Sequence, residues 1–315
     1  MTIGDNAMDE RTWEEIFTSE FFDGEVRFKE SMRDYTSLRI GGPADIIAMP
    51  KDPMSMKNIF IVAKKRDIPV FPIGSGTNLL VMDGGIEGIV LSLKFFKRID
   101  VLEDEGEVVE LFVEAGSPLQ GLVSFAKEKG YAGIEALAGI PGSVGGAIFM
   151  NAGAFGVEMK DVIKSVAVMD KNGMLNRLDR DEIGFSYRQS SIPQGSVILS
   201  ANIILKKADK TYVEEKTRQY MDKKRQSQPL KEHSAGCAFK NPAGDSAGRL
   251  IELAGCKGMR VGDAEVSHIH ANFIVNKGNA TAKDFLKLME IVRSRVKDAS
   301  GVLLEPEIRI VGKND

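Results

Sequence analysis

The middle of the sequence contains successive strand-like segments that are rarely separated by a helix. Apolar and β-branched residues dominate these segments, and two of them flank the turn-forming pair Asn172-Gly173, as in a β-hairpin. The segments are residues 88–93, 107–116, 163–179 and 197–207. One helical pattern, residues 118–130, interrupts them. A doubly wound domain would alternate strands with helices, so we predict an α+β sheet domain here.

The preceding part of the chain has a different order of elements. A strand is expected near residues 44–49, a helix after Pro53 and a second strand at residues 69–74. This is a small β-α-β unit. Before it, residues 1–20 form a polar leader with one short helix expected around Trp13.

A charged, helical stretch at residues 208–230, which Pro229 stops, is taken as the start of a C-terminal domain. Helices are expected at residues 245–255, with Gly255 as cap, and at 281–298, where Thr281 and Asp284 resemble a capping box. Strands are expected at residues 271–278 and 301–312. The organisation is therefore a leader at 1–20, then units at 21–85, 86–206 and 207–315.

Composition excludes several classes of protein. The 315 residues exceed the length of one typical domain. The charged residues are Lys+Arg 42 and Asp+Glu 45, so there is no excess of positive charge to attract nucleic acid. Two cysteines cannot form a disulfide framework, which favours a reducing cytoplasm. The acidic N-terminus does not resemble a signal peptide. Residues 136–157 lack charge over a membrane-spanning length, but their glycines and proline favour a loop.

Two glycine-rich stretches, residues 72–81 and 138–156, are candidates for binding an anion such as a diphosphate. Six glycines fall among the eighteen residues 139–156, and small residues let backbone N–H groups approach a ligand closely. Neither stretch matches a standard nucleotide motif, because GSGTNL lacks the third glycine of G-x-G-x-x-G. Any one glycine pair is also explained by a tight turn.

Several other residues are candidates for chemistry. Arg188 has the planar donors that recognise a carboxylate or phosphate, although such an arginine is more often a surface ion-pair partner. Glu305 and Glu307 lie two apart on the expected last strand and should share a face with Arg309, a possible partner. His268 and His270 lack an evident third ligand, so no metal site is expected.

Eight motifs together resemble one family, the UDP-N-acetylenolpyruvoylglucosamine reductases, also called UDP-N-acetylmuramate dehydrogenases. The resemblance extends from about Tyr35 to Gly312. The motifs, in the order seen in the family, are YTSLRIGGPAD, PIGSGTNLLV, AGIPGSVGGAIFMNAGAFG, SYRQS, GCAFKNP, AGRLIELAG, HANFIVN and LEPEIRIVG. Only six residues follow Ser190 before the next strand, so the chain resembles the shorter branch, which lacks a tyrosine-bearing lid loop.

The resemblance implies a two-part FAD-binding region of the vanillyl-alcohol-oxidase type, at 21–85 and 86–206, and a smaller α+β substrate-binding domain. It implies an oxidoreductase in which NADPH reduces FAD, which then reduces UDP-N-acetylglucosamine enolpyruvate to UDP-N-acetylmuramate for peptidoglycan synthesis. Cell-wall biogenesis, cell shape, the cell cycle and cell division depend on that product. We expect a cytoplasmic monomer with no nucleic-acid partner and no membrane insertion.

The resemblance also assigns site residues. Arg188 and Glu307 would stabilise the enolate, with Glu307 protonated and Glu305 favouring that state. Cys237 stands where the family usually has a proton-donating serine, and a thiol of pKa about 8.5 keeps a transferable proton. The alternative for Cys237 is a small filler beside a turn. Substrate contacts are expected from Tyr187, Arg225, Lys240 and Asn241. FAD contacts are expected from Gly74, Ser75, Gly76, Thr77, Asn78, Leu79, Gly139, Pro141, Gly142, Ser143, Gly145, Gly146, Asn151 and Gly153.

Two alternatives remain open. One is another flavoprotein of the same fold, such as an oxidase acting on a different alcohol or sugar, which would consume oxygen with that substrate. The other is a nucleotide-sugar binding module without a redox role, which would carry no flavin and would not be reconstituted with FAD.

Overall fold

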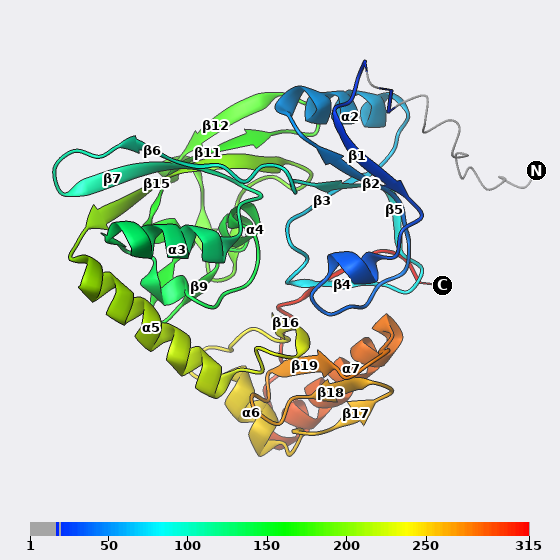
Figure 1. Ribbon diagram of the computed structural model, residues 1–315. Coiled ribbons are helices and arrows are strands. Elements are labelled where there is room, and N and C mark those ends of the chain that lie inside the picture. The colour runs from blue at the N-terminus through cyan, green and yellow to red at the C-terminus, as the bar shows by residue number, and fades with distance from the viewer. Residues whose placement is uncertain (1–16, 19, 315) are drawn as a thin grey trace, which may run out of the picture.

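The computed structural model describes residues 17–18 and 20–314, and these form three regions, each built on its own sheet (Figure 1). The helix expected around Trp13, with most of the polar leader, lies outside the described residues. Helix and strand are mixed in every region, as the α+β prediction requires.

The first region contains a four-stranded sheet of order β1-β2-β5-β3. Strands β2 and β3 both run parallel to β5, which lies between them, so the predicted β-α-β unit is present with one strand inserted. Helix α2 begins where the Asp52 carboxylate accepts the N–H groups of Met54 and Ser55. The elements are β1 Gly24–Phe28, η1 Met32–Tyr35, β2 Ala44–Pro50, α2 Pro53–Lys65, β3 Val70–Ile73, β4 Leu79–Val81 and β5 Ile86–Ser92.

The expected boundary between residues 85 and 86 requires correction. Strand β5 begins at Ile86 and pairs with β2 and β3, so the first sheet continues through Ser92. The sequence pattern of 88–93 indicated a strand but not its partner strands, which are selected by long-range pairing.

The second region is a six-stranded antiparallel sheet of order β12-β11-β15-β7-β6, with β8 also pairing to β15. The predicted hairpin is β11 and β12, and Asp170 accepts backbone N–H groups from Asn172 and Met174 in its turn. The elements are β6 Ile99–Glu103, β7 Val108–Glu114, α3 Leu119–Lys129, β8 Tyr131–Ala132, η2 Glu135–Leu137, α4 Val144–Phe149, β9 Gly153–Ala154, β10 Val157–Glu158, η3 Met159–Asp161, β11 Ile163–Met169, β12 Leu175–Asp179, η4 Arg180–Glu182, β13 Phe185–Ser186, β14 Gln189–Ser190 and β15 Val197–Lys207.

Helix α5, Lys210–Ser227, packs against α3 and η2 of the second region (Figure 1). The expected boundary between residues 206 and 207 is therefore also corrected, because α5 belongs by its contacts to the region before it. The strongly charged composition of this helix gave no indication that one of its faces is buried. On that face Val213 is 1% exposed and Lys224 is 3% exposed.

The C-terminal region has a four-stranded sheet of order β16-β19-β18-β17 covered by two helices. The predicted capping box of the last helix is present, since Thr281 Oγ1 accepts Asp284 N–H and the Asp284 carboxylate accepts Thr281 N–H. Gly255, the expected cap, has φ +68° just after α6. The elements are β16 His233–Cys237, α6 Ala247–Leu253, β17 Arg260–Val261, β18 Ala264–Val266, β19 Phe273–Asn276, α7 Ala282–Ser300 and β20 Arg309–Val311.

The expected strand at residues 301–312 is mostly irregular. Only β20 is a strand, and it pairs in parallel with β4 of the first region rather than with the C-terminal sheet. The expectation that Glu305 and Glu307 share a strand face is therefore wrong. Both residues precede the strand, in a segment held by a bridge between Phe239 and Pro306.

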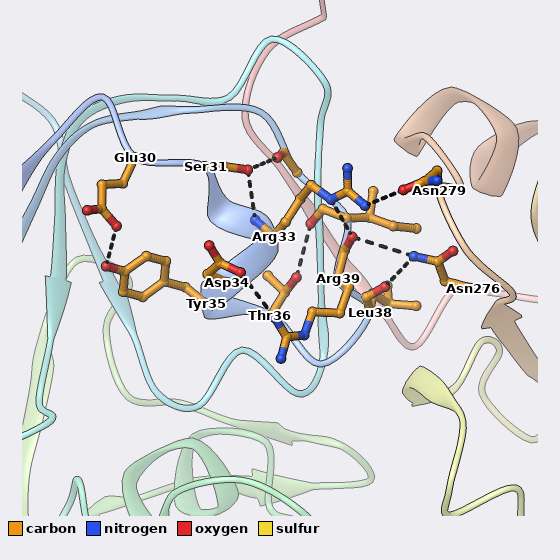
Figure 2. A network of polar contacts seen from close by, with 12 residues as sticks. Glu30, Ser31, Arg33, Asp34, Tyr35, Thr36, Leu38, Arg39, Asn276 and Asn279 are labelled. Atoms are coloured by element: carbon orange, nitrogen blue, oxygen red, sulfur yellow. Dashed lines mark hydrogen bonds and ion pairs between the residues drawn. The ribbon is translucent and has the colours of Figure 1, made fainter.

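The C-terminal region is joined to the first region through a shared core and polar contacts. Leu38, Ile40 and Leu80 of the first region complete the C-terminal hydrophobic core. Figure 2 shows the polar part of this contact, where Arg33 Nη2 donates to Asn279 Oδ1 at 3.0 Å and the Asn276 amide donates to the Leu38 carbonyl at 2.9 Å. No helix in the described part of the chain is both long enough and apolar enough to cross a membrane.

A carboxylate of the first region also caps a C-terminal helix. Asp83 accepts the N–H groups of Ala282 and Lys283 at 2.8 and 3.0 Å, at the positive end of α7. We expect Asp83→Ala to lower the free energy of unfolding by about 1 kcal/mol, or roughly 2–4 °C in Tm, measured by thermal unfolding. Asp83→Asn keeps an acceptor without the charge and should give an intermediate Tm. An unchanged Tm for the alanine variant would contradict this role for the cap.

Candidate active site

The three regions surround a cavity of about 920 Å³, within the usual size range of ligand sites. The predicted flavin residues that line it are Gly74, Ser75, Gly76, Thr77, Asn78, Leu79, Gly139, Pro141, Gly142, Ser143, Gly145, Gly146 and Gly153. The predicted catalytic residues Arg188, Cys237 and Glu307 line the same cavity.

The two glycine-rich stretches lie against each other at this cavity. A Cβ at Gly74 would come within 2.4 Å of Ser143 Oγ, and one at Gly142 within 2.9 Å of Thr77 Oγ1. Thr77 Oγ1 also donates to the Pro141 carbonyl at 3.4 Å. Glycine is thus required for this approach, and the resulting wall of backbone and small side chains fits an extended dinucleotide such as FAD.

Asn151 is the predicted flavin residue that the structure places elsewhere. Its side chain is fully buried, and its amide nitrogen donates to Glu158 Oε2 and to the Ser186 carbonyl. Its amide oxygen accepts the Lys160 N–H at 3.0 Å. Both ends of the amide are used to hold the 151–160 loop, so Asn151 orders the segment beside the cavity instead of lining it.

Gln120 of α3 lines the cavity and was missed from the sequence. Its amide nitrogen donates to the Ile140 carbonyl at 2.7 Å, while its amide oxygen accepts the Gly139 N–H at 2.8 Å. Gln120 therefore fixes the start of the second glycine-rich stretch. The helical pattern of 118–130 contained no indication that this glutamine faces a loop twenty residues away.

Gly76 offers a test of the glycine-rich wall. Its φ is +63°, and a Cβ would lie 2.0 Å from the Tyr35 carbonyl oxygen, so Gly76→Ala must displace the 74–79 loop. We expect FAD binding to weaken by at least about tenfold, equivalent to about 1.4 kcal/mol, measured as flavin absorbance per chain and by FAD titration. Gly156→Ala is the matched control, because φ there is +85° but a Cβ would meet nothing within 4 Å. Equal FAD affinities for the two variants would contradict the expected role of the loop.

Arg188 and Glu307 form an ion pair at the cavity wall. Arg188 Nε donates to Glu307 Oε1 at 2.8 Å, and Arg188 Nη2 donates to the Gly153 carbonyl at 3.1 Å. The arginine occupies the left-handed region at φ +58°, in the two-residue turn between β13 and β14. This turn directs the guanidinium toward Glu307 and the cavity.

Glu307 is held from two regions at once. Its N–H donates to the Ala238 carbonyl of the C-terminal region at 2.9 Å, and its carbonyl accepts the Asn78 amide of the first region at 3.2 Å. Burial raises the pKa of Glu307, while the Arg188 charge opposes that rise. The expected contribution of Glu305 is wrong, since the Glu305 side chain is 76% exposed and pairs with Lys240.

Cys237 is the last residue of β16. The pairing of β16 with β19 shifts register between Ser234 and Cys237, where Gly236 has φ +76°. This bulge places Cys237 on the cavity lining. Among the described residues both cysteines are free thiols.

The Cys237 thiol is a weaker acid than the sequence suggested. Burial, and secondarily the nearby Glu307 charge, raise its pKa to about 12. The thiol is therefore neutral across the physiological range and holds a proton.

The predicted substrate residues lie around the cavity, not on its lining. Tyr187 is 44% exposed beneath the Arg188 guanidinium, and Lys240 Nζ lies 3.6 Å from Glu305 Oε2. Asn241 Oδ1 accepts the Ala247 N–H at 3.0 Å, which holds the start of α6. Arg225 is a surface residue with a 63% exposed side chain paired to Asp222.

Lys224, the neighbour of Arg225, lines the cavity from α5 together with Met221, and Arg309 of β20 lines it too. Arg309, which the sequence offered as one partner for the two glutamates, lies over the Phe149 ring at 5.0 Å. Lys224 was missed because it stands in a charged stretch. Its spacing of eleven residues from the buried Val213 places both on one helical face, which was the available signal.

The connection that could carry a lid is short. Strand β14 ends at Ser190 and β15 begins at Val197, so only residues 191–196 join them. A long lid loop is thus absent from this position in the described chain, in agreement with the expected shorter branch.

The structure has a sheet with a β-α-β unit, an antiparallel sheet, and two glycine-rich loops that face each other between them. These features define a FAD-binding flavoprotein. The family model for an FAD binding domain matches residues 44–179. The model for the C-terminal domain of UDP-N-acetylenolpyruvoylglucosamine reductase matches residues 228–311. The chain belongs to the UDP-N-acetylenolpyruvoylglucosamine reductase family, and it is 41% identical over 289 residues to a curated member from Geotalea uraniireducens.

Similarity to the known members extends over nearly their whole length. The Geotalea protein is covered over 95% of its length and this chain over 92%. UDP-N-acetylenolpyruvoylglucosamine reductase 2 of Symbiobacterium thermophilum is 44% identical, with 92% of this chain and 94% of that protein covered. The crystal structure of the reductase from Thermus caldophilus superposes with a TM-score of 0.79 at 38% identity, covering 92% of this chain and 99% of that one. The resemblance in the motifs is confirmed.

Proposed function

We propose that this protein reduces UDP-N-acetylglucosamine enolpyruvate to UDP-N-acetylmuramate, with FAD as bound cofactor and NADPH as reductant. The observation that carries the proposal is the convergence of Arg188, Glu307 and Cys237 on a cavity that the paired glycine-rich loops also line. One chain supplies all of these residues, which supports a monomer. Its free thiols support a reducing cytoplasm.

The residues that would hold FAD are those of the 74–79 and 139–146 loops, and Gln120 positions the second of these. The chemistry that bound FAD supplies is two-electron hydride transfer. Addition of hydride to the methylene carbon of the enolpyruvyl group develops negative charge on the neighbouring carbon and on the adjacent carboxylate oxygens.

Arg188 stabilises that charge. Its guanidinium is fixed by Glu307 and the Gly153 carbonyl, so it needs little reorganisation when the carboxylate binds. Glu307, with its raised pKa, gains a proton more readily than an exposed glutamate and in that state donates a hydrogen bond to the same oxygens. Both groups act at the carboxylate and enolate oxygens.

Cys237 Sγ holds the proton that completes the reduction. The proton passes from sulfur to the carbon next to the carboxylate, and the resulting thiolate regains a proton from solvent after product release. One hydride and one proton thus add across the double bond. The Arg188 charge and a hydrogen bond with the Asn272 side chain both lower the pKa of Cys237, so these two groups would stabilise the transient thiolate.

The test is a two-step anaerobic absorbance experiment on the purified, FAD-loaded protein. NADPH should bleach the flavin absorbance, and addition of UDP-N-acetylglucosamine enolpyruvate should restore it rapidly. A flavin that is reduced but is reoxidised only by oxygen would favour the oxidase alternative. A folded protein that binds UDP-sugars but cannot be reconstituted with FAD would favour the binding module.

A further inference from the structure

Asn272 stands in the HANFIVN motif, to which the resemblance assigned no site residue. It directly precedes β19, and its side chain is buried, with 2% exposed. Its backbone carbonyl accepts the Ala238 N–H at 2.7 Å. A buried polar residue is thus attached to the residue that follows Cys237.

The Asn272 amide is fixed in one orientation by the backbone of Phe239. Its Oδ1 accepts the Phe239 N–H at 3.0 Å, and its Nδ2 donates to the Phe239 carbonyl at 2.8 Å. A flipped amide would place donor against donor and acceptor against acceptor, so the positions of its oxygen and nitrogen are determined. One Nδ2 hydrogen is used in this way, and the direction of the second hydrogen is fixed with it.

The second amide hydrogen has its partner in Cys237. Burial and then the Glu307 charge raise the pKa of the Cys237 thiol, whereas the Arg188 charge and a hydrogen bond with the Asn272 side chain lower it. A hydrogen bond that lowers a thiol pKa favours the thiolate, so Asn272 is its donor and the sulfur its acceptor. Tyr187 is a further titratable group whose pKa the Cys237 charge affects.

We propose that Asn272 is a positioning residue for Cys237, because its locked amide holds the sulfur as an acceptor and leaves the S–H free to point into the cavity. The inference rests on the proposed function, in which Cys237 gives its proton to carbon. It goes beyond stabilisation of the thiolate, since it assigns to Asn272 the direction in which the proton leaves. A neutral amide also leaves the thiol protonated before the reaction.

The first test measures how fast iodoacetamide alkylates Cys237 in the FAD-loaded protein, by mass spectrometry of the peptide that contains it. Only the thiolate reacts, so at pH values of about 8–10, below the thiol pKa of about 12, the rate follows the thiolate fraction. Asn272→Ala removes the donor and raises the pKa of the thiol. We expect the alkylation rate to fall roughly three- to tenfold at each pH.

Asn276→Ala is the matched control. Asn276 is 4% exposed at the other end of β19, and its amide donates to the Leu38 carbonyl at 2.9 Å (Figure 2). Its oxygen accepts the N–H groups of Gly278 and Ala280, both at 3.0 Å. Both variants remove a buried amide from the C-terminal region, so both should lower Tm. The control should leave the alkylation rate of Cys237 within about twofold of wild type.

Cys256 reports any loosening of the C-terminal region in the same samples. It is fully buried in the hydrophobic core that includes Phe239, so its alkylation requires local opening. A purely structural effect of Asn272→Ala would speed alkylation of both cysteines. The proposal instead predicts a slower rate at Cys237 and an unchanged rate at Cys256. An unchanged or faster rate at Cys237, or an equal decrease in Asn276→Ala, would overturn it.

The second test is a double-mutant cycle on flavin reoxidation by the enolpyruvyl substrate. Asn272→Ala should slow reoxidation by about tenfold when Cys237 is present, but by less than about twofold in a Cys237→Ala background. A loss transmitted through Glu307, whose N–H donates to the Ala238 carbonyl, would persist without the thiol. Equal losses in the two backgrounds would therefore overturn the proposal.

The two tests separate this inference from the proposed function. A wild-type flavin that the enolpyruvyl substrate does not reoxidise would contradict the proposed function. The alkylation rates need no turnover, so they would still decide whether Asn272 acts on the Cys237 thiol.

Discussion

Cys237→Ala is expected to keep the reduction of its flavin by NADPH and to lose reoxidation by UDP-N-acetylglucosamine enolpyruvate by about 10²–10⁴-fold, the usual contribution of a positioned general acid. The thiol is the neutral, proton-bearing group at the end of β16, and its raised pKa of about 12 keeps the proton in place before the reaction. Alanine removes that proton while changing little of the surrounding volume. Anaerobic stopped-flow absorbance resolves the two half-reactions.

Cys237→Ser is the control for this prediction. A hydroxyl keeps a transferable proton at the same position, so the serine variant should remain active in both half-reactions. Normal reoxidation of the alanine variant would instead identify Cys237 as a small residue that only fills the bulge of β16.

Arg188→Met is expected to lower kcat/KM for the enolpyruvyl substrate by about 10²–10³-fold, with a smaller effect on flavin reduction by NADPH. The substitution removes the donors that we propose bind the substrate carboxylate. It also leaves Glu307 buried without its cation, which raises the pKa of that carboxyl further. Steady-state kinetics and single-turnover reoxidation measure the loss.

The double variant Arg188→Met with Glu307→Gln separates chemistry from stability. Replacing both partners avoids an unpaired carboxylate, so the double variant should be no less stable in thermal unfolding than Arg188→Met alone. Its activity should stay low, because neither group remains to stabilise the enolate. Recovery of activity in the double variant would exclude a direct role for Arg188.

Much of the local structure followed from the sequence. The Thr281–Asp284 capping box and the hairpin at Asn172-Gly173 depend on contacts within a few residues, and short sequence patterns indicate such contacts. The pairing partners of β5 and β20 were not predictable. Both strands pair with distant segments of the first region, and a strand pattern does not specify its neighbours.

The residues of the candidate site also fall into two groups, those that the sequence identified and those that only the structure placed. Residues within motifs, such as Arg188, Cys237 and Glu307, were identified from the sequence and lie on one cavity. Asn151 stood in a motif yet supports a loop, and Arg225 points to solvent while its neighbour Lys224 reaches the cavity. Which of two adjacent basic residues is buried depends on how α5 packs on α3 and η2, and that packing is a tertiary property.

By itself the sequence determined the α+β class, the two glycine-rich stretches, the family and the three residues proposed for chemistry. Only the tertiary structure decided that burial, not Glu305, raises the pKa of Glu307, that the Cys237 thiol is a weak acid, and that the Lys224 amine is buried against the Ala138 carbonyl. The physical reason is that residue types and short-range spacing are properties of the chain. Desolvation and charge pairing depend on the groups that folding brings together from distant positions.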